Sequence, residues 1–162
     1  MKSDLIREFK EEAEKTRKIL LRVPTDKFDW QPHEKNSSFR ALAQHIANVP
    51  SWVGATLKHD GLDFANPMPK NEPAADNDAL MAFFEMRNTE ALKVLEEMDE
   101  AELKRDWTMR MGEQIFFTKP KGDVLREFVF NHIVHHRGQL SLYLRMLDIP
   151  VPALYGPTAD ER

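Results

Sequence analysis

Cysteine is absent from the 162 residues of this chain. Its absence excludes disulfide bonds, thiolate ligands to a metal ion and a cysteine nucleophile. A chain without cysteine is compatible with a reducing compartment, and we expect a cytoplasmic protein. The amino end is charged from Lys2 onward and amphipathic. It therefore predicts neither a signal peptide nor a membrane span.

A basic run is also missing. The chain has 23 lysine and arginine residues against 27 aspartate and glutamate residues, which gives a net charge of -4. Proteins that bind a phosphate backbone carry a basic patch or a stripe of basic residues interleaved with aromatic ones. We therefore expect no nucleic-acid partner.

Several catalytic motifs are lacking as well. The sequence has no glycine-rich phosphate loop and no serine in a nucleophile elbow, so covalent catalysis has no evident nucleophile. A zinc-protease HExxH motif is excluded because Ile133 follows His132. Di-iron bundles need a glutamate three residues before a histidine. The residues found at that place are Leu42, Val129, His132 and Ile133.

What the sequence does contain is helical periodicity. With 41% hydrophobic and 31% charged residues, it predicts one globular domain over residues 1–162. Apolar residues recur at three- and four-residue steps, which predicts an all-α protein. The expected helices cover about residues 4–23, 37–58, 76–98 and 120–147. Pro24 should end the first helix, and Pro50 should bend the second.

A different pattern lies between the last two helices. Trp107, Met109 and Met111 alternate with polar residues, and the apolar segment 115–117 follows after Gly112. Alternation of this kind is typical of strands, and a glycine can turn the chain. We therefore expect a short β-hairpin before the last helix.

Histidines are concentrated in the last helix. Residues 131–139 carry three of the six histidines, and His132 and His136 are four residues apart, on one helix face. His132 and His136 interrupt the apolar stripe of the last helix, and His45 interrupts that of the second helix. Two imidazoles from one helix and a third from another would suit a zinc-type divalent ion, with a position left for water or substrate. The alternative is that each is a hydrogen-bonded core histidine.

His135 competes with its neighbours as a ligand. On an α-helix, His136 lies about 40° from His132, whereas His135 lies about 60° from His132 on the opposite side. The apolar residues Val129 and Leu140 extend the row of His132 and His136. We therefore expect His135 at a helix-packing boundary, outside the metal site.

Other side chains flank the histidines. Gln139 and Tyr143 follow the last histidine by three and seven residues, and Asn48 stands near one turn beyond His45. Their polar ends would either face the same cavity or form local hydrogen bonds within the packed helices. Arg137 points about a quarter turn away and is expected to form a salt bridge to another helix or to the tail.

The sequence resembles the DinB/YfiT superfamily. The residues that carry the resemblance are Asn131, His132 and 135–140 in the last helix, His45 and Trp52 in the second, and 149–152, 155–157 and 159–161 in the tail. It implies a four-helix bundle in up-down-down-up order. It also implies that His45, His132 and His136 bind a divalent metal, usually zinc or nickel. The candidate pocket residues are Asn48, Trp52, Gln139 and Tyr143.

Members of this superfamily include thiol-dependent S-transferases and a maleylpyruvate isomerase, which use low-molecular-weight thiols such as bacillithiol or mycothiol. The resemblance therefore implies a metal-dependent enzyme of the S-transferase or hydrolase type, with a small-molecule substrate and a thiol cosubstrate. The alternative is a non-catalytic, stress-response bundle with a structural ion. No residue of this sequence identifies a particular thiol. The apolar, proline-rich tail and the hairpin also predict a homodimer.

Overall fold

The computed structural model describes residues 2–66 and 70–161, and these are mostly helical with a small three-stranded sheet. The α-helices are α1 (Lys2–Leu20), α2 (Phe39–Asn48), α3 (Ser51–Leu57), α4 (Asn77–Glu97), α5 (Lys121–Leu125) and α6 (His132–Met146). The other elements are the 3-10 helices η1 (Thr25–Lys27) and η2 (Glu100–Lys104), the π-helical segment η3 (Arg126–Asn131), and the strands β1 (Gly61–Asp63), β2 (Asp106–Met111) and β3 (Gln114–Pro120).

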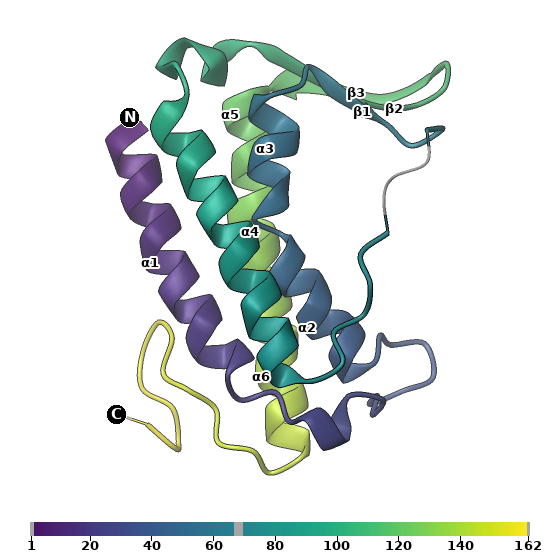
Figure 1. The fold of residues 1–162 in the computed structure, drawn as a ribbon, viewed down its shortest axis with the longest axis vertical. Coiled ribbons are helices and arrows are strands. Elements are labelled where there is room, and N and C mark those ends of the chain that lie inside the picture. Colours follow the sequence, from purple (N-terminus) through teal and green to yellow (C-terminus); the bar gives the residue numbers. More distant parts are fainter. Residues whose placement is uncertain (1, 67–69, 162) are drawn as a thin grey trace.

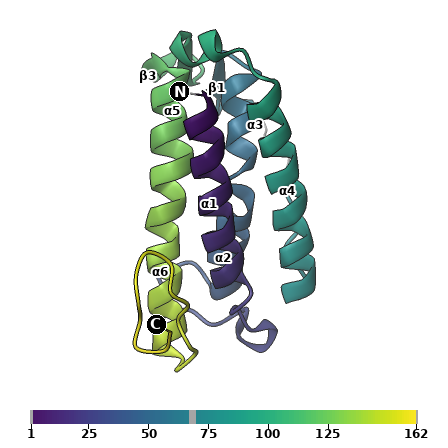
Figure 2. The ribbon, with the colours of Figure 1, turned by 90° about the vertical axis from the view of Figure 1, so that its left-hand side faces the viewer.

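The long helices lie side by side. Figure 1 shows α1, α4, the α2–α3 pair and the α5–η3–α6 column running along one another, with the sheet at one end. Figure 2 shows the C-terminal tail folded against the opposite end, beside α6. The prediction of a helical protein is confirmed, and the sheet is an addition to the all-α class that was expected.

The helix boundaries have local causes. Ser38 accepts a hydrogen bond from the Ala41 amide at 3.2 Å and so caps the start of α2, while the Asp76 carboxylate caps α4 in the same way. The predicted bend at Pro50 is a break, because α2 ends at Asn48 and α3 begins at Ser51. Proline has no amide hydrogen, so the ladder of helical hydrogen bonds is interrupted there.

Apolar side chains from all the long helices form the main core. The residues without any exposed surface include Ile19, Leu20, Phe39, Ile46, Leu80, Phe84, Leu95, Leu125 and Leu140. A smaller core lies between the sheet and α5, around Trp107, Met109 and Val124. Burial of this apolar surface is the main force that holds the helices together and attaches the sheet.

The sheet confirms the predicted hairpin and adds one strand. β2 and β3 are antiparallel, and β1 pairs with β2 in parallel. The three residues of β1 are too few to show a strand pattern, so the sequence did not predict them. At Gly61 a side chain would place its Cβ 2.4 Å from the carbonyl oxygen of Thr108, so the close approach of these strands requires glycine. Gly112 turns the hairpin with φ of 58°.

No helix within residues 2–66 and 70–161 combines the length and the apolar composition that a membrane span requires.

Candidate metal centre

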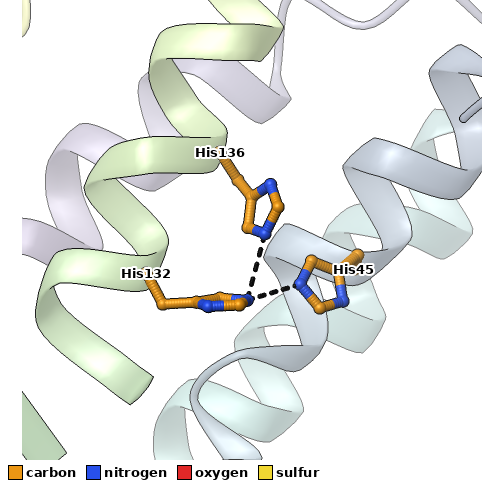
Figure 3. Close-up of side chains that lie close together, drawn as sticks. All are labelled: His45, His132 and His136. Carbon is orange, nitrogen blue, oxygen red and sulfur yellow. Dashed lines mark hydrogen bonds between the residues drawn. The ribbon is translucent and has the colours of Figure 1, made fainter. Parts of the chain in front are cut away.

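Three histidines from two helices converge on one point. The Nε2 atom of His132 lies 2.7 Å from Nε2 of His45 and 3.0 Å from Nε2 of His136. In Figure 3, His132 and His136 project from α6 toward His45 on α2. Each ring offers one nitrogen to a cluster whose ligand atoms all lie within 4.8 Å of one another, so the three could hold a metal ion. His135 is exposed and does not belong to this group.

The helix geometry explains why these nitrogens meet. His132 and His136 stand one turn apart on α6, so their rings project from the same face. His132 begins α6 directly after η3, a π-helical segment with a wider turn than an α-helix. Short π-helical insertions shift the direction of the residues beyond them and often occur at functional sites. The sequence pattern gave no sign of this segment.

The cluster lies at the edge of the helix interface, which corrects the expectation that the histidines lie within the apolar stripes of their helices. His45 is exposed, and His132 and His136 are only partly buried. The buried positions are one residue further along each helix, at Ile46 on α2 and at Ile133 on α6. One residue is a rotation of about 100° on a helix, so the histidines lie beside the apolar stripe and face solvent.

The environment keeps two of the imidazoles neutral. Loss of water contact, together with the neighbouring rings of His136, His45 and His135, lowers the pKa of His132 to about 4 from its ordinary 6.5. The pKa of His45 is also lowered, first by the partial loss of water around its ring and then by His136. Both groups therefore favour the unprotonated form, which is the form that binds a metal.

Gln139 is the candidate pocket residue that contacts a cluster histidine directly. Its Oε1 atom lies 2.7 Å from Nδ1 of His136. An amide oxygen can only accept a hydrogen bond, so Nδ1 carries a proton, and in the neutral ring Nε2 then presents its lone pair to the cluster. Gln139 thus orients His136.

The other candidate pocket residues have different partners. The Tyr143 hydroxyl donates to the carbonyl oxygen of Ser37 at 3.1 Å, and the amide oxygen of Asn48 accepts from Asn71 at 3.2 Å. Both contacts tie a loop to a helix. Trp52 stacks on Phe128, with ring centroids 5.9 Å apart.

Phe128 was not among the pocket residues predicted from the sequence. It precedes His132 by four residues, and Trp52 follows His45 by seven; both spacings would be nearly whole turns of an uninterrupted α-helix. That combination of spacings was the available signal. Phe117 of β3 continues the stack, 5.4 Å from Phe128.

Arg137 anchors another face of α6, about a quarter turn from His136. Only 1% of its surface is exposed, and it forms a salt bridge with Glu12 of α1 and a hydrogen bond with the Tyr155 hydroxyl of the tail. The predicted salt bridge to another helix is thus confirmed. Burial raises the pKa of Tyr155 to about 12, with a further contribution from its hydrogen bond to Glu12. These contacts fix α6 between α1 and the tail, with His136 on its outer side.

Fold and cluster together define a helical protein with a three-histidine group at its surface. The DinB family model matches residues 1–162, and the chain belongs to the DinB family. Two curated relatives come from Bacillus subtilis, and both are named as uncharacterized proteins. YjoA is 22% identical over 130 residues, which cover 80% of each chain. YrdA is 23% identical over 154 residues, which cover 93% of this chain and 85% of YrdA.

Solved structures show the same fold. The crystal structure of YjoA, described as a DinB-like protein, superposes with a TM-score of 0.72 at 19% identity and covers 98% of this chain and 99% of that one. A DinB-like protein from Bacillus cereus gives a TM-score of 0.69 at 22% identity and covers 92% of this chain and 94% of its own. The DinB-like fold of this chain follows from these matches.

Proposed function

We propose that His45, His132 and His136 bind one divalent metal ion, zinc or nickel, and that the protein is a metal-dependent enzyme of the thiol S-transferase or hydrolase type. The observation that carries the proposal is the convergence of three Nε2 atoms at a place open to solvent. The geometry of the nitrogens, the protonation of the rings and the exposure of the site each support it.

The nitrogen spacing fits a common ion. Nitrogens bound to one metal at about 2.0–2.1 Å lie roughly 3.0–3.4 Å from one another. The two Nε2 distances of 2.7 and 3.0 Å are within a few tenths of an ångström of this range. Small rotations of the rings would bring them into it.

Hydrogen bonds alone satisfy this arrangement poorly. Gln139 leaves Nε2 of His136 with a lone pair, so His132 would have to donate its single Nε2 proton there. The contact between His132 and His45 would then have to share that proton. A bound cation accepts all three lone pairs at once, which favours a metal over a hydrogen-bonded histidine cluster.

Exposure favours an enzyme over a structural ion. Structural metal sites are saturated by side chains, whereas catalytic sites keep an open position. His45 faces solvent, so water or a small molecule has access to the cluster. A divalent ion held by three neutral imidazoles would lower the pKa of a coordinated water or thiol, or polarise a carbonyl. The chain's own part is to keep the imidazoles of His45 and His132 neutral and to orient His136 through Gln139.

The function is tested by incubating zinc- or nickel-loaded protein with a panel of electrophiles and esters, with and without several small thiols. We expect turnover that disappears after chelation and in His132→Ala. The Phe64→Leu protein, altered outside the cluster, should keep full activity. Metal-loaded protein without turnover under any of these conditions would favour the alternative, a metal-binding bundle with a structural ion.

We also propose that the chain forms a homodimer. The support is apolar surface on the hairpin, where Ile115 is 60% and Phe116 48% exposed. Exposed apolar groups at one place commonly mark an interface. Light scattering at high micromolar concentration should give twice the mass of one chain, and a monomer there would contradict the proposal.

A further inference from the structure

Two pairs of rings follow one another along the seam between the α2–α3 pair and the α5–η3–α6 column. The first pair is His45 and His132. The second is Trp52 and Phe128, whose rings stack with planes only 13° apart. Trp52 of α3 follows His45 by seven residues, beyond the break at Pro50, and Phe128 of η3 precedes His132 by four residues. Because α3 and η3 adjoin the sheet end of the molecule (Figure 1), the aromatic pair lies on the sheet side of the histidines.

A third ring extends the aromatic pair, and the smaller core packs against all three rings. Phe117 stacks on Phe128 at 5.4 Å with planes 18° apart, which gives a series of three rings, here called the aromatic stack (Trp52, Phe128 and Phe117). All three rings are partly buried and pack against the smaller core around Trp107. Since that core fixes their orientation, the surface that remains exposed is a preformed aromatic platform.

An ion pair lies at the Phe117 end of the aromatic stack. Lys119 lies over the Phe117 ring, 5.2 Å from its centre, and donates to both carboxylate oxygens of Glu127 at 2.7 and 2.8 Å. The ammonium and the carboxylate neutralise each other, so this end of the stack favours an uncharged group. On the other side of the histidines the surface is polar, with Gln139 bonded to His136. The two sides of the histidine cluster therefore offer different chemistry.

We infer that the aromatic stack binds a planar aromatic group of the substrate while the other end of the same small molecule coordinates at the three-histidine cluster. This inference rests on the proposed metal site and adds a substrate class to it. A ring laid against the stack removes apolar surface from water and gains the offset or edge contacts that aromatic pairs favour. A saturated ring of similar size gains the burial without those contacts.

The test uses cobalt(II)-loaded protein, in which a bound thiolate gives a charge-transfer absorption band. Three thiols are titrated: benzyl mercaptan, cyclohexylmethanethiol and 2-mercaptoethanol. We expect benzyl mercaptan to bind about tenfold more tightly than cyclohexylmethanethiol, and 2-mercaptoethanol to bind most weakly. Equal affinities for benzyl mercaptan and cyclohexylmethanethiol would overturn the inference and leave the metal site intact.

Substitutions of single rings test whether the aromatic stack causes the preference for benzyl mercaptan. Trp52→Leu and Phe128→Leu keep apolar volume and remove one ring each, so each should weaken benzyl mercaptan about tenfold without changing 2-mercaptoethanol. The matched control is Phe64→Leu, because Phe64 contacts Phe116 and lies outside the stack. A loss that affects all three thiols equally would contradict a specific aromatic site.

Two further measurements separate the possible failures. Circular dichroism and thermal melting show whether each variant folds, and the thiol series on the unaltered protein decides the question even if a variant does not. Cobalt absorption bands before any thiol is added report the metal site itself. Absence of these bands would defeat the proposed function and this inference together, whereas cobalt binding without preference among the thiols would defeat this inference alone.

Discussion

The Nε2 atoms of His45 and His132 lie 2.7 Å apart, although 87 residues separate the two histidines in the sequence. This contact joins α2 to α6 at the solvent side of the helix interface. A metal bound here would link the two helices directly. Its affinity should therefore depend on both helices and on the residues that orient the rings.

Metal content should distinguish the three cluster histidines from their neighbour. We expect His45→Ala, His132→Ala and His136→Ala each to weaken metal binding by about a hundredfold or more, since a lost ligand costs at least as much as a lost supporting residue. His135→Ala should keep about one metal per chain. Elemental analysis of the four purified variants checks this. A metal-free His135→Ala beside a loaded His136→Ala would show that the ligand assignment is wrong.

Gln139 should affect metal affinity without being a ligand. Its Oε1 accepts from Nδ1 of His136, so Gln139→Leu removes the group that orients this ring. We expect metal affinity to fall by about 10- to 100-fold while the fold is retained. Competition with a chromogenic chelator measures the change. Gln139→Glu serves as the control because its carboxylate can still accept the hydrogen bond; equal losses in both variants would contradict the orienting role.

The metal-free protein should lose stability in mild acid through His132. The pKa of His132 is about 4 in the folded protein and 6.5 in the unfolded chain. Between these pH values the unfolded chain therefore binds a proton at His132 that the folded protein does not bind. This contribution to the free energy of unfolding is complete above pH 6.5 and is lost as the pH falls through 4. Because solvent reaches the ring, we expect a loss of about 1–2 kcal/mol.

Urea unfolding of the metal-free protein at several pH values measures this dependence. His132→Asn should show a shallower fall in the free energy of unfolding between pH 6.5 and 4, because the titrating ring is gone. In the unaltered protein, the imidazole proton signals of His132 should shift with a midpoint near pH 4. Parallel pH profiles for protein and variant would contradict the prediction.

The buried salt bridge between Arg137 and Glu12 should dominate the attachment of α6 to α1. Only 1% of the Arg137 side chain and 12% of the Glu12 side chain are exposed. Glu12→Gln leaves a buried guanidinium without a counter-charge, which we expect to cost about 3 kcal/mol of unfolding free energy. Tyr155→Phe removes one hydrogen bond and should cost about 1 kcal/mol.

Chemical denaturation measures both losses. The matched control is Glu96→Gln, which breaks an exposed pair with Lys10 and should change stability by less than about 1 kcal/mol. Similar losses of unfolding free energy in Glu12→Gln and Glu96→Gln would show that the buried pair contributes no more to stability than the exposed pair.

The sequence by itself determined the local features of this protein. The spacing of His132 and His136 predicted that they share a helix face, and the angles around that helix excluded His135. Helix starts were predicted near residues 37 and 76, where Ser38 and Asp76 cap α2 and α4, and the alternation around Met109 predicted the hairpin. Each of these depends on hydrogen bonds or side-chain directions within a few residues, which the residue order specifies directly.

Tertiary structure alone decided the features that depend on contacts between elements. Packing of α2 against α6 decided that the row containing His45 lies at the edge of the interface, because Ile46 and not His45 fills the core. Pairing of β1 with β2 and stacking of Trp52 on Phe128 likewise need partners more than 40 residues away. A side chain becomes buried, exposed or part of a site according to what the rest of the fold places against it. The spacing of residues along one helix does not specify which side chains of other elements will pack there.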